Sequence, residues 1–426
     1  MSGFGLEKAI MSTIRTLEHS TPSSIDYRVY DDPEIFALEQ ERIFRGPVWS
    51  FLGLSSEVPE ENCYKSTFVG ETPVVLVGGK DGALHAWVNR CVHKGAKVCR
   101  NARGRAEGGA FVCVYHQWAY DATGALRSVP YRRGMVGKGG MPASFDIKAH
   151  RMMPLRVDKV GDMIFATFSD EAPDLRSFLG PAMCRAIERI FVRPTKVIGR
   201  VAQRIEANWK LYAENSRDSY HGGLLHLFYT TFGLWRPAQD SKAEIDEVYG
   251  FHNSFQIRKP QQAEDPQKHK EETARPLDAM TLLDPTLLEL RQDIGDDISL
   301  SIQSIFPSVV LQQIGQALAV RHMIVREPGA MDLVWTYFGF QDDEEDMTRH
   351  RLRAINMVGP AGYVSVEDGE AVEICTDGIK GPDGHSLILM DIEKAENPTV
   401  PMGLDENAVR GFWKGYLKLM RAGEGQ

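Results

Sequence analysis

The chain has 426 residues, of which 43% are hydrophobic and 25% are charged, as in ordinary soluble globular proteins. This length suits two or three domains, or one large domain with a small insertion. Its 49 basic and 58 acidic residues give a net charge of −9, which argues against a nucleic-acid-binding protein. No apolar run approaches the roughly 20 residues that span a bilayer, and the N-terminal segment lacks the basic and apolar regions of a secretory signal. We therefore expect a cytoplasmic protein that binds neither nucleic acid nor membrane.

The chain begins with a predicted helix and continues into a β-rich region. Residues 32–45 have the pattern of a helix, because Asp32 can cap the first turn and Pro33 fits the first helical position. Between about residue 48 and residue 169, short runs of β-forming residues alternate with Gly and Asn turns. This pattern predicts a compact antiparallel β domain.

The remainder of the chain mixes helices and strands. Residues 177–191 and 342–358 are predicted helices, and the second has acids at its start and arginines towards its end, which suits the helix dipole. Residues 197–209 and 304–326 are predicted strands, and residues 333–340 are the expected hairpin partner of the second strand. The sequence therefore predicts an α+β protein in which a β domain is inserted into a larger domain.

Five potential metal ligands lie close together in the β-rich region. Six cysteines in the whole chain are too few for a disulfide scaffold, and clustered cysteines in a reducing compartment more often bind metal. Two short mixed pairs, Cys91-x-His93 and Cys113-x-x-His116, each follow an apolar β run, so two hairpin tips could present them to one centre. Cys99 lies between the pairs and belongs to neither, so we expect it to be a bystander.

Two kinds of metal centre are compatible with these pairs. A structural zinc site uses Cys₂His₂ ligands, but zinc fingers place both cysteines in one pair and both histidines in the other. Mixed pairs suit a two-iron cluster in which two thiolates bind one iron and two imidazoles bind the other. The pairs, followed by Trp118, resemble the Rieske [2Fe–2S] motif. A Rieske electron carrier needs only about 100 residues, so the long segment that follows requires another function.

A second group of potential ligands follows in residues 208–226. Asp218, His221 and His226 have the spacing Asp-x-x-His-x₄-His. On a regular helix the two histidines would diverge by about 140°, but Gly222 and Gly223 between them permit a backbone distortion. Two histidines and one carboxylate form the facial triad of non-haem Fe(II) oxygenases.

The carboxylate of such a triad has several candidates. Asp218 is three residues before His221, a spacing that suits a carboxylate bonded to the outer nitrogen of a ligand histidine. The third ligand would then come from residues 359–373, which offer Glu367, Asp368 and Glu370.

Together these motifs resemble the catalytic α subunit of the aromatic-ring-hydroxylating Rieske oxygenases. The resemblance implies that Cys91, His93, Cys113 and His116 bind the cluster, and that His221, His226 and Asp368 bind a mononuclear Fe(II). It also implies an antiparallel β Rieske domain inserted into a helix-grip-type catalytic domain with a central antiparallel sheet. The expected boundaries are residues 1–45 for the N-terminal helical segment of the catalytic domain, 46–168 for the Rieske domain and 169–426 for the catalytic iron domain.

The same resemblance implies partners. The family forms trimers of α subunits, often with a small β subunit as α3β3, in which Asp218 would bridge the mononuclear site to a Rieske histidine of the next subunit. Electrons would come from NADH through a reductase, a ferredoxin or both, and O₂ would be the oxidant. A Rieske monooxygenase or demethylase without a β subunit, and a non-enzymatic electron carrier, are the alternatives.

The resemblance is strongest to the branch that acts on anthranilate, salicylate and terephthalate, through residues 139–146, 224–236, 304–322 and 409–416. A carboxylate substrate needs a fixed cation, and Arg321, at the end of an apolar strand, is the candidate; a structural ion pair is its alternative role. Residues 401–409 contain no arginine of the kind that holds the second carboxylate in terephthalate relatives, so we expect a monocarboxylate. Single and double hydroxylation both remain open. Candidate pocket residues are Asn215, Ser216, Leu225, Val309, Gln313, Val364 and Ser365.

Overall fold

The structure, a computed structural model, describes residues 15–232, 241–258, 283–291, 293–381, 384–392, 399–401 and 405–422. Residues 233–236 and 402–404, which belong to two segments considered above, lie outside these ranges. The chain forms two compact units. The inserted unit comprises Phe44–Leu175, and the main unit comprises Met1–Ile43 together with Arg176–Gln426.

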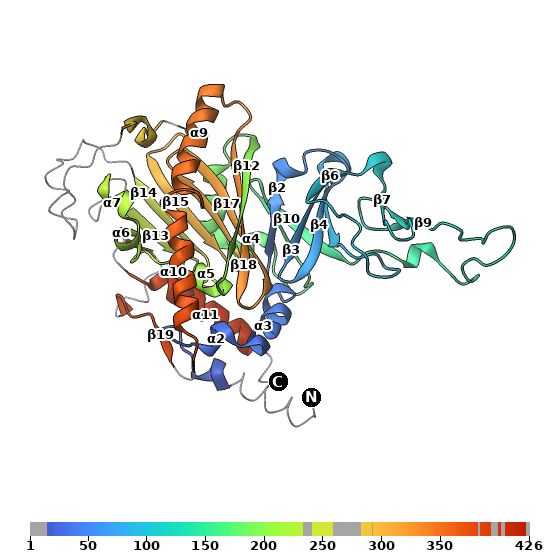
Figure 1. Ribbon diagram of the computed structural model, residues 1–426, viewed down its shortest axis with the longest axis horizontal. Coiled ribbons are helices and arrows are strands. Elements are labelled where there is room, and N and C mark those ends of the chain that lie inside the picture. Colours follow the sequence, from blue (N-terminus) through green and yellow to red (C-terminus); the bar gives the residue numbers. More distant parts are fainter. Residues whose placement is uncertain are drawn as a thin grey trace. The chain divides into compact units, whose positions relative to one another are not determined.

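The inserted unit is built on antiparallel strands, as the sequence predicts. Its larger sheet has seven strands in the order β2-β11-β10-β5-β4-β3-β6, and its smaller sheet has the order β7-β8-β9 (Figure 1). Gly70, at φ 55°, allows the two-residue turn between β3 and β4. The strands are β2 (Ser50–Leu54), β3 (Cys63–Val69), β4 (Thr72–Gly78), β5 (Leu84–Val88), β6 (Arg103–Arg105), β7 (Phe111–Val112), β8 (Ala119–Tyr120), β9 (Leu126–Ser128), β10 (Pro154–Val160) and β11 (Met163–Thr167).

The main unit is organised around an eight-stranded antiparallel sheet in the order β12-β18-β17-β16-β15-β14-β13-β20. The strands are β12 (Thr195–Ile205), β13 (Ser241–Ile245), β14 (Asn253–Arg258), β15 (Ile298–Ile305), β16 (Val309–Ile314), β17 (Ala317–Glu327), β18 (Ala330–Phe340) and β20 (Thr399–Pro401). A separate pair joins β1 (Ser24–Asp26) to β19 (His385–Leu387). The predicted α+β class with a central antiparallel sheet is thus confirmed.

Two predicted strands of the main unit differ from the observed ones. The strand predicted over residues 197–209 ends at Ile205, because the Asn208 side chain accepts a hydrogen bond from the Lys210 backbone N–H and caps a helix there. The strand predicted over residues 304–326 is a hairpin of β16 and β17, because Gly315 adopts φ 54° in a tight turn. The expected pairing of β17 with β18 is confirmed.

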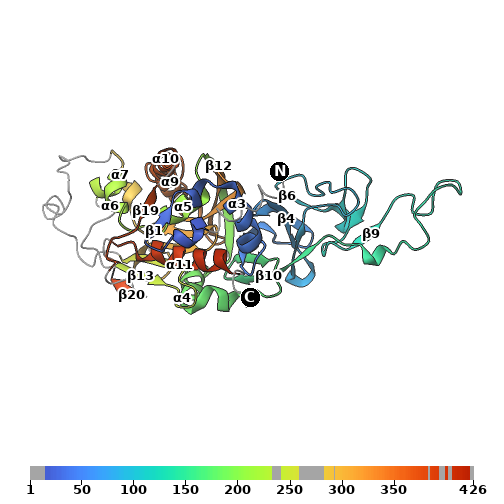
Figure 2. The same ribbon diagram turned by 90° about the horizontal axis from the view of Figure 1, so that it is seen from below.

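Helices cover the sheet of the main unit. The helix α9 (Glu345–Val358) packs on β17 and β18, and α10 (Ser365–Gly378) packs on α5 (Trp209–Asn215). Figure 2 shows α9 and α10 on the opposite side of this unit from α4 (Leu175–Ile190). Another long helix among the described residues is α11 (Asn407–Arg421). No described helix combines the length and the apolar character that a membrane span requires.

The N-terminal segment of the main unit contains the first predicted helix. Asp32 accepts a hydrogen bond from the Glu34 backbone N–H and caps α3 (Pro33–Glu39), which continues as a π-helical turn over Gln40–Phe44. The short helix α2 (Arg28–Asp31) precedes it. The predicted helix and its cap are confirmed.

A buried polar cluster joins three distant segments of the main unit. The Glu39 carboxylate at the end of α3 accepts hydrogen bonds from Trp209 Nε1 (2.8 Å), Lys210 Nζ (2.6 Å) and Tyr416 Oη (2.6 Å). Burial lowers the pKa of Lys210, and the Glu39 charge opposes that effect. Because every partner is satisfied, this cluster fixes α5 against α3 and α11. The helix α5 leads directly into the segment that carries Asp218 and the two histidines.

Candidate metal centres and substrate cavity

The two Cys–His pairs of the inserted unit lie in loops with the same backbone hydrogen-bond pattern. In the loop after β5, Cys91 N–H donates to the Ala96 carbonyl and the Cys91 carbonyl accepts from Gly95 N–H. In the loop after β7, Cys113 N–H donates to the Trp118 carbonyl and the Cys113 carbonyl accepts from Gln117 N–H. Gly95 and Gln117 occupy the same place in the two loops, and both have positive φ (76° and 56°). The inserted unit therefore presents two equivalent turns, each with one thiol and one imidazole.

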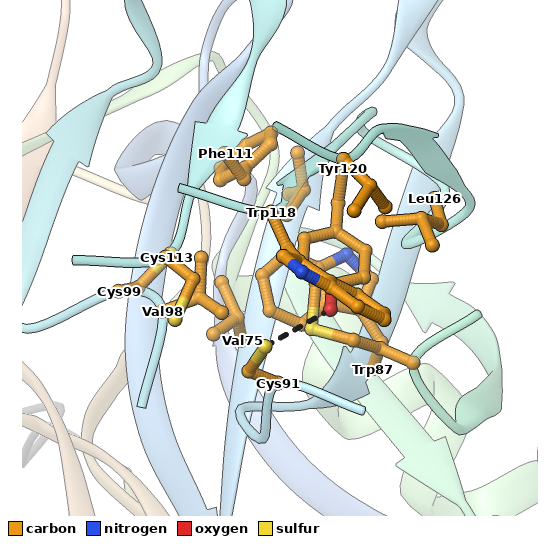
Figure 3. Close-up of a cluster of buried hydrophobic side chains, with 13 residues drawn as sticks. Val75, Trp87, Cys91, Val98, Cys99, Phe111, Cys113, Trp118, Tyr120 and Leu126 are labelled. Carbon is orange, nitrogen blue, oxygen red and sulfur yellow. Dashed lines mark hydrogen bonds between the residues drawn. The ribbon is translucent and has the colours of Figure 1, made fainter. Parts of the chain in front are cut away.

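The thiols and the imidazoles of these loops differ in environment. Cys91 and Cys113 are buried in an apolar cluster with Trp118 (Figure 3), whereas His93 is half-buried and His116 is exposed. The two imidazole rings lie 4.5 Å apart between centroids, and His93 stacks on the Trp118 ring at 4.8 Å. His93 Nδ1 is buried without a hydrogen-bond partner among the described residues, as suits a nitrogen reserved for a metal.

The separation of thiols from imidazoles suits a two-iron cluster. Cys91 and Cys113 lie in the apolar cluster, whereas the rings of His93 and His116 lie together, 4.5 Å apart between centroids. A Rieske cluster binds one iron through two thiolates and the other through two imidazoles, whereas a single zinc ion takes all four ligands at one point.

Cys99 is positioned by a different contact. The Asn89 side chain accepts hydrogen bonds from the backbone N–H groups of Val98 and Cys99 and donates to the Cys99 carbonyl at 2.7 Å. Burial raises the pKa of the Cys99 thiol to about 12. A thiol that keeps its proton is a poor metal ligand, which agrees with the expected bystander role.

The second centre lies in the main unit. His221 immediately precedes α6 (Gly222–Leu225), His226 separates α6 from α7 (Leu227–Thr231), and Asp368 is in the first turn of α10. Asp368 Oδ1 lies 3.5 Å from His221 Nε2 and 3.3 Å from His226 Nε2. The structure therefore brings the three predicted Fe(II) ligands together, although they are far apart in sequence.

The break that aligns the histidines is not at the predicted place. We expected the distortion at Gly222 and Gly223, but both belong to α6, and neither has positive φ. The chain departs from helical geometry at His226 itself, with φ −85° and ψ 74°. This break places the imidazole centroids of His221 and His226 5.2 Å apart.

Each histidine of the triad has a carboxylate on its outer nitrogen. Asp218 Oδ2 lies 3.2 Å from His221 Nδ1, and Glu367 Oε2 lies 2.9 Å from His226 Nδ1. Such contacts fix the imidazole so that Nε2 points to the metal. The contact of Glu367 was missed in the sequence, where this residue was only an alternative ligand. Glu370, the other alternative, is exposed.

The electrostatics of the triad favour a cation at its centre. Burial alone would lower the pKa of His221, but its hydrogen bonds with Asp218 and Asp368 raise that pKa to about 10. Burial alone would raise the pKa of Asp368, but His221 and His226 hold it well below its usual range. A Fe(II) ion supplies the same positive charge, so the residues fit the mononuclear iron.

A cavity of about 110 Å³ opens onto the triad. Its wall includes five of the predicted substrate residues, which are Asn215, Ser216, Arg321, Val364 and Ser365. Leu225, Val309 and Gln313 are not part of the wall. Gln313 instead accepts a hydrogen bond from Arg189 and donates to the Ile298 carbonyl. Its neighbour Gln312 faces the cavity, because successive strand residues point to opposite faces of the sheet.

Arg321 is buried in the wall of this cavity, at 4% exposure. It donates a hydrogen bond to Tyr212 Oη at 3.1 Å and lies over the Trp335 ring at 5.2 Å. Within the described part of the chain its Nε has no hydrogen-bond partner and no carboxylate forms an ion pair with it. No acid in the described ranges therefore accounts for this charge.

The comparisons with known proteins cover nearly the whole chain. Residues 48–148 match the family model of the Rieske [2Fe-2S] domain, and residues 192–422 match that of the ring hydroxylating alpha subunit catalytic domain. The chain is 41% identical to the anthranilate 1,2-dioxygenase large subunit of Burkholderia cepacia, over 94% of each protein. It is 38% identical to a terephthalate 1,2-dioxygenase terminal oxygenase subunit alpha of Comamonas sp, over 94% of this chain and 96% of that protein.

A third relative and a solved structure are also similar to this chain. The chain is 35% identical to the large oxygenase component of salicylate 5-hydroxylase from Ralstonia sp, over 93% of this chain and 94% of that protein. The naphthalene 1,2-dioxygenase of Rhodococcus sp., solved with bound indole, superimposes with a TM-score of 0.79 and 22% identity, covering 99% of this chain and 100% of that chain, and so shares its fold. On this evidence the chain belongs to the α subunits of the ring-hydroxylating Rieske oxygenases, enzymes that carry a [2Fe–2S] cluster and a mononuclear iron.

Proposed function

We propose that this oxygenase subunit hydroxylates an aromatic monocarboxylate of the anthranilate or salicylate class, using O₂ and electrons from NADH. The observation that carries the proposal is Arg321, a buried guanidinium in the cavity wall with no carboxylate partner among the described residues. A buried cation without an anion is costly, and a substrate carboxylate would supply one. The similar proteins named for anthranilate and salicylate agree with this substrate class.

The residues of the two centres take the following proposed roles. Cys91, His93, Cys113 and His116 hold the cluster, and His221, His226 and Asp368 hold the iron. When bound, the iron supplies the capacity to activate O₂ for attack on the ring. The chain itself orients both histidines through Asp218 and Glu367 and fixes the substrate carboxylate on Arg321, while Tyr212 holds the guanidinium in place.

The size and polarity of the cavity support a single substituted ring. An apolar cavity of about 150 Å³ holds benzene, so a volume of about 110 Å³ is on the scale of one ring. Asn253 Oδ1 and Gln312 Nε2 are buried in its wall without hydrogen-bond partners among the described residues. These amides are suited to an ortho amino or hydroxyl group, because a buried polar atom needs a partner.

The charge of the cavity favours one substrate carboxylate over two. Arg217 also lines the cavity, but its guanidinium donates to the backbone carbonyls of Ala213 (2.7 Å) and Phe251 (3.2 Å). Burial lowers the pKa of Arg217 to about 9. The Nε of Arg217, like that of Arg321, has no partner among the described residues, but both terminal nitrogens of Arg217 are held by backbone carbonyls. These two bonds make Arg217 a poorer receptor for a second carboxylate, so a terephthalate-type dicarboxylate is the less favoured alternative.

Partners follow from the same family membership. The similar proteins are named as large or alpha components, which implies multi-component oxygenases. We infer a small β subunit in an α3β3 assembly, a ferredoxin or reductase as donor, and a role for Asp218 between His221 and a Rieske histidine of the next subunit. Co-expression with a candidate β subunit, followed by mass measurement of the complex, separates this assembly from an oxygenase without a β subunit.

Substrate binding to the ferrous site tests the proposed function. With the Rieske cluster oxidised and EPR-silent, the NO adduct of the mononuclear iron is titrated with anthranilate, salicylate, benzoate, terephthalate and naphthalene. An ortho-substituted monocarboxylate should change the signal at the lowest concentration. In Arg321→Gln the apparent dissociation constant should rise roughly 30-fold or more, since breaking a buried charge pair costs about 2–5 kcal/mol.

The matched control is Arg326→Gln, on the same strand but exposed. It should leave the titration unchanged. Tightest binding of naphthalene or terephthalate would reject the proposed substrate class, and equal effects of the two arginine variants would reject Arg321 as the anchor.

A further inference from the structure

A buried tyrosine in the cavity wall has a hydroxyl group for which the mechanism above has no use. Tyr229 lies on α7, three residues after His226, and is 5% exposed. Its hydroxyl oxygen is buried without a hydrogen-bond partner among the described residues. We propose that Tyr229 binds the substrate by donating a hydrogen bond to the carboxylate that Arg321 holds. This inference rests on the proposed substrate class and adds a second donor to its carboxylate site.

The turn that follows His226 fixes the position of Tyr229. The Tyr229 backbone N–H donates to the His226 carbonyl at 3.1 Å. The Tyr229 ring meets the His226 imidazole at 6.0 Å between centroids, with 62° between the two planes. Because both the backbone and the ring contact a residue of the triad, the hydroxyl has a defined place in the cavity wall beside the iron site.

The surroundings of the hydroxyl favour an anion as its partner. The negative charge of Asp368 and the positive charge of Arg321 both act on Tyr229, so the iron ligand and the substrate anchor are both near it. Burial, reinforced by Asp368, raises the pKa of Tyr229 well above its usual value, and the hydroxyl therefore keeps its proton. A buried donor without an acceptor is costly, and an anion bound beside Arg321 would supply that acceptor.

A single carboxylate can serve both residues. Its two oxygens offer about four lone-pair sites, and a bidentate guanidinium uses two of them. In Arg321, Nη1 donates to Tyr212 Oη, whereas Nε has no hydrogen-bond partner among the described residues and remains available to the substrate. The lone pairs that Arg321 leaves unused can then accept a hydrogen bond from Tyr229.

The test is the variant Tyr229→Phe, which removes only the hydroxyl. The NO adduct of its mononuclear iron is titrated with anthranilate and with benzoate, which lacks the ortho group. Both ligands carry the carboxylate, so both dissociation constants should rise by a similar factor, roughly 15-fold or more for a lost hydrogen bond to a charged group. Unchanged constants would overturn the proposal. A rise for anthranilate alone would also overturn it, because the hydroxyl would then contact the ortho group.

The matched control is Tyr337→Phe. Tyr337 is buried on β18, and the charge of Arg321 acts on it as well, but it is not among the described residues that line the cavity. This variant should keep both dissociation constants of the wild type. Equal losses in the two variants would reject a specific role for Tyr229.

The same titrations separate this inference from the proposed function. If the wild type binds both acids, and Arg321→Gln weakens them while Tyr229→Phe does not, only the inference fails. If the wild type binds naphthalene more tightly than either acid, the proposed substrate class fails, and the role of Tyr229 fails with it.

A second replacement covers the case in which Tyr229→Phe loses its iron, as iron analysis would show. A ring-fluorinated tyrosine, incorporated at position 229 alone, keeps the ring and the hydroxyl but makes the hydroxyl a stronger donor. Benzoate should then bind more tightly than it binds to the wild type. Equal or weaker binding would contradict the proposal.

Discussion

The two metal centres of this chain are built in opposite ways. The cluster ligands lie within residues 91–116, on two loops of the same form, and the outer imidazole His116 is exposed. The triad joins a broken helical segment to the start of α10, and His226 and Asp368 are buried.

The two regions differ in charge as well. The inserted unit contains 17 basic and 13 acidic residues, whereas the rest of the chain contains 32 basic and 45 acidic residues. An electron-transfer centre needs ligands that reach the surface, and an oxygenase centre needs a dry cavity with firmly oriented ligands.

Because the two centres are formed by different segments in different environments, we expect a substitution at one centre to leave the other intact.

The largest effect is expected from a substitution in the triad. The variant Asp368→Ala should lose one iron per chain and all hydroxylase activity, because two histidines alone leave the ion without its anionic ligand. Iron and sulfide analysis together with the Rieske EPR signal checks this result. The mirror variant Cys113→Ser should lose the cluster and keep the mononuclear iron. Loss of both centres in either variant would show that they do not assemble independently.

A smaller effect is expected at the outer contact of His221. Asp218→Asn removes the charge opposite His221 Nδ1 but keeps the size of the side chain. Product formation should fall by up to about 100-fold, the upper end for such partners, while iron content stays near that of the wild type. Single-turnover oxidation of the reduced cluster measures the rate at which electrons leave the cluster. If this oxidation keeps its normal rate, Asp218 takes no part in the electron path.

The corresponding contact of His226 should matter less. The Glu367 side chain is more exposed than that of His226, the ligand that it contacts. Glu367→Gln should therefore weaken iron binding by about tenfold. Competition with a chelator measures the affinity. Glu370→Gln, on the exposed side of the same helix, is the control and should bind iron as the wild type does. Equal losses in both variants would reject a specific role for Glu367.

The smallest effect concerns the substrate anchor. Tyr212→Phe removes the hydroxyl that accepts a hydrogen bond from Arg321. A hydrogen bond of this kind contributes about 1 kcal/mol, so KM for the aromatic acid should rise about fivefold with little change in kcat. Steady-state kinetics measure both constants. A fall in kcat at constant KM would instead place Tyr212 in the chemical step.

Sequence reasoning names candidate residues most directly where a site depends on short spacing. The Cys–His pairs and the histidines at 221 and 226 are local patterns, so their residues could be named without the fold. Asp368 required the resemblance to a family, because no periodicity connects it to the histidines. Glu367 was overlooked as a partner of His226, since that contact exists only after α10 packs on α5.

The errors have equally local causes. The cavity was assigned Gln313 in place of Gln312, and a shift of one residue in a strand exchanges its two faces. The break between the histidines is predicted at the glycines because glycine tolerates distortion, but the backbone leaves helical geometry at His226. Strand ends were misjudged where a cap or a turn, rather than hydrophobicity, stops the strand.

The buried cluster around Glu39 has a consequence for the order of events during synthesis. Glu39 and Tyr416 are 377 positions apart, and the helix between them that carries Lys210 leads to the triad. The main unit therefore cannot complete its core until nearly the whole chain has left the ribosome. The inserted unit is continuous in sequence and emerges much earlier, and domains generally fold as units from the N-terminal side. The cluster-binding unit can therefore fold during synthesis before the residues of the mononuclear iron site come together.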